Sequence, residues 1–389
     1  MIPKGWSSQK LSSVASIIDC KHRTPEYVKS GIPLVSPGTI KWGALDLISP
    51  VKRVTEEEYR SLMDHCVVEQ GDLVMSRNQS VGVVSYVDSK KPFVLGQDTV
   101  LIKPIHADWR FIYYTLQSDL VQRQIAKSAG GSTFSRINLS DIRALNIKTP
   151  AIYEQDKISQ ILLTWDKAIS VTEKLLANSQ QQKKALMQQL LTGKKRLMRD
   201  NGGRFTKKWE ETTLGDIAKI TTGNSNRQDS TLDGKYTFFD RSEDIRTSSI
   251  YLFDSEAIIV PGEGQRFVPK YFIGKFDLHQ RTYAIMDFDG YSGKFLFYMI
   301  DYLKAYFLSQ AVGSTVKSLR LPMFQKMVFE APEIEEQQKI ASVLSAADAE
   351  ISILEKKLAC LKDEKKALMQ QLLTGKRRVK VDAEEAVSA

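Results

Sequence analysis

Apolar residues recur at alternating intervals of four and three in two long stretches of the chain. In the second stretch the repeating positions are Ile340, Leu344, Ala347, Ile351, Leu354, Leu358, Leu361, Lys365, Leu368 and Leu372. In the first stretch, which is weaker in the middle, they are Ile158, Leu162, Trp165, Ile169, Thr172, Leu176, Ser179, Lys183, Leu186 and Leu190. Such a seven-residue repeat predicts a long helix with one apolar seam, which a partner helix has to cover.

Start and stop signals frame both stretches. Pro150 and Pro332 suit the first position of a helix, and Gly193 and Gly375 suit the position just after its end. With a rise of about 1.5 Å per residue, roughly 42 helical residues would form a rod on the order of 60 Å. We therefore expect two long helices of equal length.

The two stretches are copies of each other. Residues 183–194 (KKALMQQLLTGK) recur unchanged as residues 365–376, which lie 182 positions further on. A weaker match joins residues 6–17 (WSSQKLSSVASI) to residues 209–220 (WEETTLGDIAKI). The chain is therefore a tandem duplication. The simplest partner for each helix is the other copy, antiparallel to it and related by a pseudo-twofold axis.

The segments outside these copies contain short β-rich runs that alternate with turn signals, and each segment closes with a helical stretch. We predict an α+β fold in which two quasi-repeated mixed α/β domains, residues 1–149 and 201–331, alternate with two long spacer helices, residues 150–200 and 332–389. The helices would form an antiparallel coiled coil with pseudo-twofold symmetry. In the alternative arrangement, each helix packs only on its own domain.

The composition is that of a globular protein with a basic surface. The chain has 389 residues and a formal net charge of +9, which permits nucleic acid or an anionic membrane surface as a partner. No apolar stretch approaches the roughly 18 residues of a membrane-spanning helix. Three scattered cysteines, Cys20, Cys66 and Cys360, argue against a disulfide framework. We expect a soluble, cytoplasmic protein.

Recognisable catalytic motifs are missing from the sequence. It has no phosphate-binding loop, no glycine-rich dinucleotide fingerprint, no nucleophile elbow and no HExxH zinc motif. The pairs Cys20/His22 and His65/Cys66 lack the spacing of a tetrahedral metal site. The sequence thus predicts a chain with neither catalytic residues nor metal ligands.

This order of variable and repeated segments resembles the specificity subunits of type I restriction–modification enzymes. The resemblance rests on the repeated KKALMQQLLTGK segment and on the helix starts at Pro150 and Pro332, each followed by Glu-Gln and Lys-Ile pairs. It also rests on residues 71–82 (GDLVMSRNQSVG), which are similar to a strand-and-loop signature of target-recognition domains. The resemblance covers essentially the whole chain.

The resemblance implies a non-catalytic subunit that reads a bipartite, asymmetric target in double-stranded DNA, with the helices fixing the unread spacer. Its partners would be two adenine-N6 methyltransferase (modification) subunits and ATP-dependent restriction subunits that translocate and cut DNA. S-adenosylmethionine, ATP and Mg²⁺ would be bound by those partners, and no cofactor by this chain. The helix positions expected to form the spacer and partner contacts are Ile158, Leu162, Trp165, Leu186, Leu190, Ile340, Leu344, Ile351, Leu368 and Leu372.

Candidate DNA contacts fall in two kinds of segment. A loop that follows a predicted strand offers side chains suited to base edges, namely Arg77, Asn78, Gln79 and Ser80 in the first domain and Gln265 and Arg266 in the second. The Gly-Ser-Thr segments offer phosphate contacts through Ser132, Thr133, Arg136, Ser314, Thr315, Lys317 and Arg320. The structural alternatives are solvated hairpin tips for the loops and plain turns for the Gly-Ser-Thr segments.

The basic residues 194–199 and 376–380 follow the two helices, and we expect them to complement the helix dipoles rather than to contact DNA. Two other functions stay open. One is a coiled-coil scaffold with two protein-binding heads and no role on DNA. The other, which the missing motifs oppose, is a self-sufficient methyltransferase or nuclease.

Overall fold

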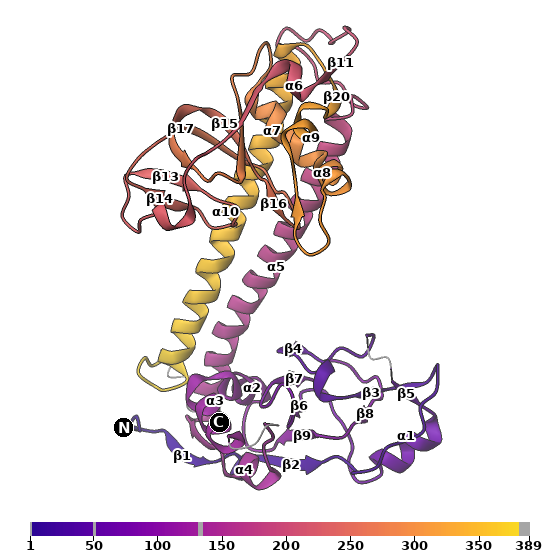
Figure 1. Cartoon of the computed structure of the whole chain (residues 1–389). Helices are drawn as coiled ribbons and strands as arrows, with labels where there is room; N and C mark the ends of the chain where they lie inside the picture. The colour runs from indigo at the N-terminus through magenta and orange to yellow at the C-terminus, as the bar shows by residue number, and fades with distance from the viewer. Residues whose placement is uncertain (1, 50–51, 131–134, 381–389) are drawn as a thin grey trace. The chain divides into compact units, whose positions relative to one another are not determined.

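The computed structural model describes residues 2–49, 52–130 and 135–380, and it divides into two compact units. The first unit comprises Met1–Thr172 with Lys357–Ala389, and the second comprises Glu173–Lys356. Each unit thus contains one end of each long helix, α5 (Ile152–Leu190) and α10 (Ile334–Leu372) (Figure 1). The units cut across the four segments predicted from the sequence, because neither helix belongs to a single unit.

The first unit is built on a five-stranded sheet. The strand order is β2 (Ala15–Asp19), β9 (Thr99–Pro104), β6 (Leu73–Ser76), β7 (Val84–Tyr86) and β4 (Gly43–Ala44). A smaller sheet has the order β5 (Arg53–Val54), β3 (Ile32–Val35) and β8 (Val94–Leu95). The helices are α1 (Glu56–Met63), α2 (Trp109–Gln117), α3 (Asp119–Ala129) and α4 (Leu139–Ala144).

Two apolar cores hold this unit together. The larger core joins the sheet to α2 and α3, and it includes Ile158 and Leu162 of α5 together with Leu372 at the end of α10 and the next residue, Leu373. The smaller core lies among the three-stranded sheet, α1 and the sheet residues Val74 and Leu101. The first core therefore fixes the long helices to the domain, and the second supports a subdomain that carries α1.

The second unit is built on a six-stranded sheet. Its order is β12 (Lys219–Thr222), β18 (Thr282–Met286), β15 (Phe253–Pro261), β17 (Lys270–Leu278), β13 (Tyr236–Phe239) and β14 (Arg246–Ser248). A two-stranded ribbon pairs β16 (Glu263–Gly264) with β19 (Lys317–Ser318). The helices are α6 (Leu214–Ile217), α7 (Gly293–Tyr302), α8 (Lys304–Gln310) and α9 (Leu321–Gln325) (Figure 1). The main core again takes in helix ends, here Leu190 of α5 with Ile340 and Leu344 of α10.

The long helices obey their sequence signals. Each has 39 residues, and Gly193 and Gly375 follow the ends with φ angles of 65° and 70°, in the left-handed region that favours glycine. Every predicted seam position is buried or half-buried, whereas Val171 and Ile353 beside the seam are exposed. In each unit the start of one helix packs against the end of the other, which confirms the antiparallel pair. The alternative arrangement, in which each helix packs on a domain, holds only for the helix ends, which also contribute residues to the domain cores.

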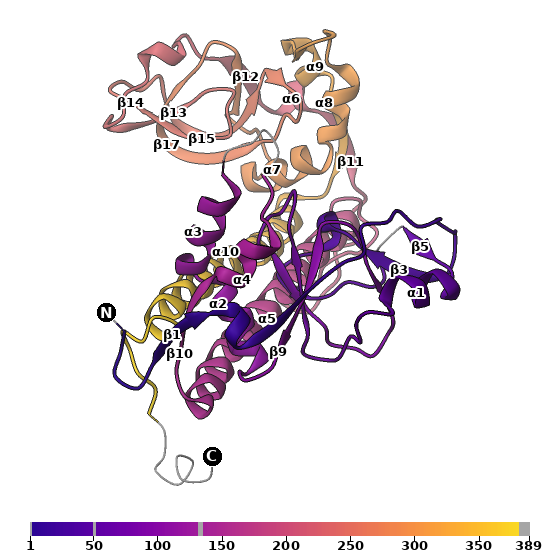
Figure 2. The same cartoon turned by 90° about the horizontal axis from the view of Figure 1, so that it is seen from below.

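The sequence duplication is preserved as a structural duplication. Strand β1 (Ser7–Lys10) pairs antiparallel with β10 (Asn146–Thr149) so that Ser7 faces Thr149 (Figure 2). Strand β11 (Glu210–Thr213) pairs in the same way with β20 (Val328–Ala331). Each of these strands lies where the sequence repeat places it. The two units therefore share one frame, by which we mean the ends of the long helices and the residues that attach each domain to them, including the short strand pair.

Candidate nucleic-acid interface

The loop after β6 is a compact turn built from its own polar groups. The Ser76 hydroxyl donates to the Asn78 carbonyl over 2.6 Å, and the Gln79 amide donates to Asn78 Oδ1 over 2.7 Å. Gln79 has a φ of 59°, an unusual value for a residue with a side chain. The Ser80 hydroxyl donates to the Pro37 carbonyl over 3.0 Å. The turn leaves the Gln79 side chain exposed.

Arg77 does not face solvent with its neighbours. Its side chain is buried, with Nη1 2.7 Å from Asp19 Oδ1 and Nε donating to the Ile137 carbonyl over 3.2 Å. A base contact by this guanidinium would require breaking both interactions. The geometry therefore argues against direct base reading by Arg77 and gives it a supporting position beneath the loop.

Asp98 joins the loop to Arg136. Its carboxylate lies 2.8 Å from Arg136 Nη2 and accepts from Asn78 Nδ2 over 3.4 Å. Asn78 and Arg136 also form a β-bridge, and Asp98 has a left-handed φ of 61°. The structure thus brings the predicted loop and Arg136 together, while Ser132 and Thr133 lie outside the described residues.

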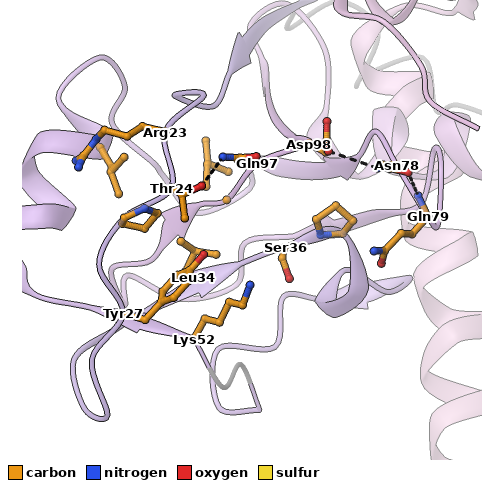
Figure 3. A pocket seen from close by; sticks show the side chains of 15 residues that line it. Arg23, Thr24, Tyr27, Leu34, Ser36, Lys52, Asn78, Gln79, Gln97 and Asp98 are labelled. Atoms are coloured by element: carbon orange, nitrogen blue, oxygen red, sulfur yellow. Dashed lines mark hydrogen bonds between the residues drawn. The ribbon is translucent and has the colours of Figure 1, made fainter. Parts of the chain in front are cut away.

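A cleft of about 340 Å³ opens beside this loop (Figure 3). Asn78 and Gln79 form part of its wall, and Gln97 and Asp98 face it from the turn before β9. Gln97 Nε2 donates to the Thr24 hydroxyl over 2.9 Å. Sequence reasoning missed Gln97 and Asp98, since no local pattern marks them and the pairing of β6 with β9 alone carries them to the loop.

The second unit has a cleft at the corresponding place, after β15. Its volume is about 590 Å³, and Gln265 and Arg266 line it. Phe267, which follows them, is buried with a φ of 47° and anchors the loop, while Gln265 and Arg266 are exposed. Arg266 Nη1 lies 3.4 Å from a Glu243 carboxylate oxygen, and both side chains are largely exposed.

The predicted phosphate segment of the second unit lies beside this loop. Strand β19 carries Lys317, which pairs with Gly264 of β16. Ser314 and Thr315 lie in the exposed turn before that strand, and Arg320 is exposed just before α9. Each unit therefore joins the loop after its strand, β6 or β15, to the end of its Gly-Ser-Thr segment, as Asn78 and Arg136 are joined in the first.

Charged residues that the sequence did not single out also line the second cleft. Glu263 pairs with Arg241 and, over 2.7 Å, with Arg281. Lys270 Nζ donates to the Ser242 carbonyl over 2.7 Å, and burial lowers the pKa of this ammonium. Lys270 begins β17, the strand that pairs with β15, and it lies four positions after Arg266, so nearness to the predicted loop was the available signal.

The basic residues after the helices make specific ion pairs within each unit. Arg378 forms a bidentate pair with Glu154, at 2.7 and 2.8 Å. Arg196 does the same with Glu336, at 2.7 and 2.6 Å. These arginines bind the first turn of the opposite helix, so the expected dipole role is not their main one. The repeat register that aligns Glu154 with Glu336 was the available signal.

Charged side chains repeat along the seam as well. Asp166 lies 2.6 Å from Lys365 Nζ and accepts from the Tyr114 hydroxyl over 2.6 Å. In the second unit Asp348 lies 2.5 Å from Lys183 and accepts from the Tyr298 hydroxyl over 2.6 Å. Each domain helix is therefore fixed to the helix pair by the same Tyr–Asp–Lys contact.

The helix residues predicted to form the spacer and partner contacts differ in how deeply they are buried. Six of these residues are fully buried: Ile158, Leu162, Leu190, Ile340, Leu344 and Leu372. The other four, Trp165, Leu186, Ile351 and Leu368, are half-buried.

Among the described residues, no group of three or more His, Cys, Asp or Glu side chains could hold a metal ion. In the same part of the chain, no helix combines the length and the apolar character needed to cross a membrane.

Comparison with known proteins agrees with this architecture. The model of the type I restriction modification DNA specificity domain matches residues 3–178 and 206–363. A protein named as a candidate MjaX type I restriction enzyme specificity subunit, from Methanocaldococcus jannaschii, is 25% identical over 97% of this chain and 95% of its own length. The EcoDI specificity subunit from Escherichia coli is 26% identical over 45% of this chain and 39% of its own length.

The fold is shared with solved structures. The S subunit of a type I restriction–modification system from M. genitalium superposes with a TM-score of 0.66 at 16% identity, over 96% of both chains. A chain from a structure of type I restriction–modification complex assembly gives a TM-score of 0.57 over 96% of this chain and 98% of its own. The two matches of the family model span most of the sequence, and this chain therefore belongs to the type I restriction modification DNA specificity domain family.

Proposed function

We propose that this chain reads a bipartite, asymmetric target in double-stranded DNA and directs modification and restriction subunits to it. One observation carries the proposal: a duplicated frame holds two clefts at corresponding places, and the clefts differ in their side chains. A symmetric frame suits two half-sites at a fixed separation, as dimeric DNA readers do. Because the two clefts differ in their side chains, the two half-sites would differ in their base sequences.

The reading groups in this proposal lie at the rims of the clefts. Gln79 in the first unit, and Gln265 and Arg266 in the second, are exposed and of the types that bond to base edges. Lys317 and Arg136 lie beside the loops and would set the register of the protein on the DNA through phosphate contacts. Arg77 acts by holding the first loop in shape.

Partner subunits would bind along the helices. Val171 and Ile353 are 56% and 65% exposed, although both are large and apolar, and they occupy equivalent positions of the repeat. Two equivalent apolar positions suit two copies of one partner. We assign them to two adenine-N6 methyltransferase subunits, with restriction subunits joining the assembly.

The chemistry would belong to those partners. We propose that this chain binds no cofactor and that S-adenosylmethionine, ATP and Mg²⁺ are bound by the methyltransferase and restriction subunits. Incubation of the lone chain with DNA, methyl donor and Mg²⁺ should then give neither methylation nor cutting. Either product would overturn the assignment.

A salt titration tests the DNA role itself. The full chain, alone or with its methyltransferase, is titrated against a duplex at increasing salt. A DNA reader loses affinity steeply, because phosphate contacts release condensed counterions. If no duplex binds at low salt while protein partners still do, the chain is a scaffold with two protein-binding heads and the proposal fails.

A further inference from the structure

The two clefts are lined by different kinds of side chain, and this difference indicates which nucleobases each cleft reads. Resting on the proposed function, we infer that the first unit reads adenine in its half-site through the side-chain amides of Gln79 and Gln97, whereas the second reads G·C pairs through Arg266 with the neighbouring Glu243. Asn and Gln amides match the adenine edge in the major groove, and Arg matches guanine. Carboxylates accept from the cytosine amino group.

The amides are the available readers of the first cleft. Gln79 and Gln97 are both exposed, and Figure 3 shows them on opposite sides of Asp98 and Asn78. The Gln97 bond to Thr24 uses one amide N–H, which leaves its carbonyl and second N–H for a base. Asn78 uses its carbonyl oxygen and one N–H on Gln79 and Asp98, so it is a positioning residue.

The cations of the first cleft are engaged elsewhere. Arg23 forms a two-point pair with Glu58, at 3.1 and 2.6 Å. Lys52 Nζ lies 4.8 Å from the centre of the Tyr27 ring. Neither cation offers the unoccupied fork that bidentate guanine contact requires. The first cleft is therefore poor in guanine readers and rich in amides.

The second cleft is lined by more charged side chains than amides. Arg266 is 78% exposed in its side chain, and its contact with Glu243, at 3.4 Å, is long for a hydrogen-bonded ion pair. Both groups can turn to a base pair without losing a buried interaction. Gln265 is the one amide among these residues, against the charged side chains of Arg241, Glu243, Glu263, Arg266 and Lys270.

Backbone strain supports both clefts as sites of recognition. Among the described residues, the non-glycine residues with left-handed φ are Gln79, Asp98, Phe267 and Asp287. The first three line the two clefts. Strained residues persist only where the surrounding structure holds them, and they collect where side chains must be aimed.

The test uses the full chain in complex with a methyltransferase subunit. DNA with both half-sites randomised is selected for binding, and the enriched target is resynthesised with 7-deaza-adenine or 7-deaza-guanine in one half-site at a time. These analogues lack the N7 acceptor and leave Watson–Crick pairing intact. We expect 7-deaza-adenine to weaken binding by roughly 5-fold to 150-fold in one half-site, and 7-deaza-guanine by a similar factor in the other.

Variants assign the half-sites to the units. Gln79→Ala and Gln97→Ala should abolish the 7-deaza-adenine effect in one half-site and leave the other half-site unchanged, and Arg266→Ala should abolish the 7-deaza-guanine effect. Lys90→Ala, a surface change outside both clefts, is the control. If the glutamine variants relax a guanine position, the inference is overturned while the proposed function stands. If no sequence is enriched at all, the proposed function fails as well.

Discussion

The two units share their frame and differ in their clefts. Beside the helices, three kinds of contact occur in both units: the arginine–glutamate pairs, the Tyr–Asp–Lys contacts and the short strand pairs. At the clefts the first unit presents amides, and the second presents charged groups. The first unit also has a three-stranded sheet that is not repeated among the described residues of the second. The duplicated units have kept the contacts that join each domain to the helices, whereas the side chains that line the clefts differ.

The largest expected effect comes from shortening one helix only. Deleting one heptad, residues 172–178, from α5 leaves α10 unchanged, so the contacts at both helix ends cannot form together and the complex should fail to assemble. Deleting the equivalent residues 354–360 as well restores matched lengths. The double deletion should assemble and accept a different DNA spacer, as measured by selection from targets of varied spacing. An unchanged spacer would contradict the ruler role of the helices.

The next effect is loss of a buried carboxylate. Glu154 and Glu336 are buried and each is held by one arginine, so Glu154→Ala and Glu336→Ala should each lower the free energy of unfolding by about 2–3 kcal/mol, because the arginine loses its partner in a partly desolvated site. Urea denaturation of the full chain measures this loss. Glu56→Ala, which breaks the exposed pair with Arg60, is the matched control and should cost less than about 0.5 kcal/mol. If only one of the two glutamates mattered, the frames would not be equivalent.

Arg77 and Arg266 should behave differently, although the sequence presents them alike. Arg77→Ala removes a buried pair with Asp19 and a bond to the Ile137 carbonyl, so we expect a loss of about 2 kcal/mol in stability and poorer reading of one half-site. Arg266→Ala should change stability by less than about 0.5 kcal/mol and weaken the other half-site alone. Denaturation and binding to each mutated half-site separate the two effects. Equal losses of affinity on any DNA would make both arginines phosphate contacts.

The smallest effect distinguishes the two tryptophans. Trp6 Nε1 donates to Glu154 over 3.2 Å, whereas Trp209 Nε1 is buried and has no hydrogen-bond partner among the described residues. Trp6→Phe should therefore lower the free energy of unfolding by about 1 kcal/mol more than Trp209→Phe. Denaturation of the two variants in parallel checks this. An equal cost would mean that the bond to Glu154 adds nothing to the shared frame.

The frame could be predicted from the sequence because its signals are local and repeated. Seam positions such as Ile158 and Leu372 follow from periodicity, and Gly193 and Gly375 mark the helix ends by conformational preference. The duplication, which is exact over residues 183–194 and 365–376, then predicted the antiparallel pairing. The duplication also explains why the end of α10 lies in the first unit, together with the N-terminal residues. This helix end repeats the end of α5, which lies in the second unit.

The clefts could be predicted only in part. Residue type and position after a strand pointed to Gln79 and Arg266, which are exposed at the cleft rims. The same reasoning could not show that Arg77 turns inward, since its partner Asp19 lies on β2, far away in the sequence. Gln97 escaped notice because strand pairing, not local pattern, carries it to the first cleft. Lys270 was overlooked although it lies four positions after Arg266.

The most direct test of a duplicated frame with two unlike clefts is a map of methylated adenines in the genome of cells that express this chain with a type I methyltransferase subunit. The account predicts one new motif with two different half-sites, separated by a spacer of constant length. A palindromic motif, a single uninterrupted site or no new methylation would contradict it.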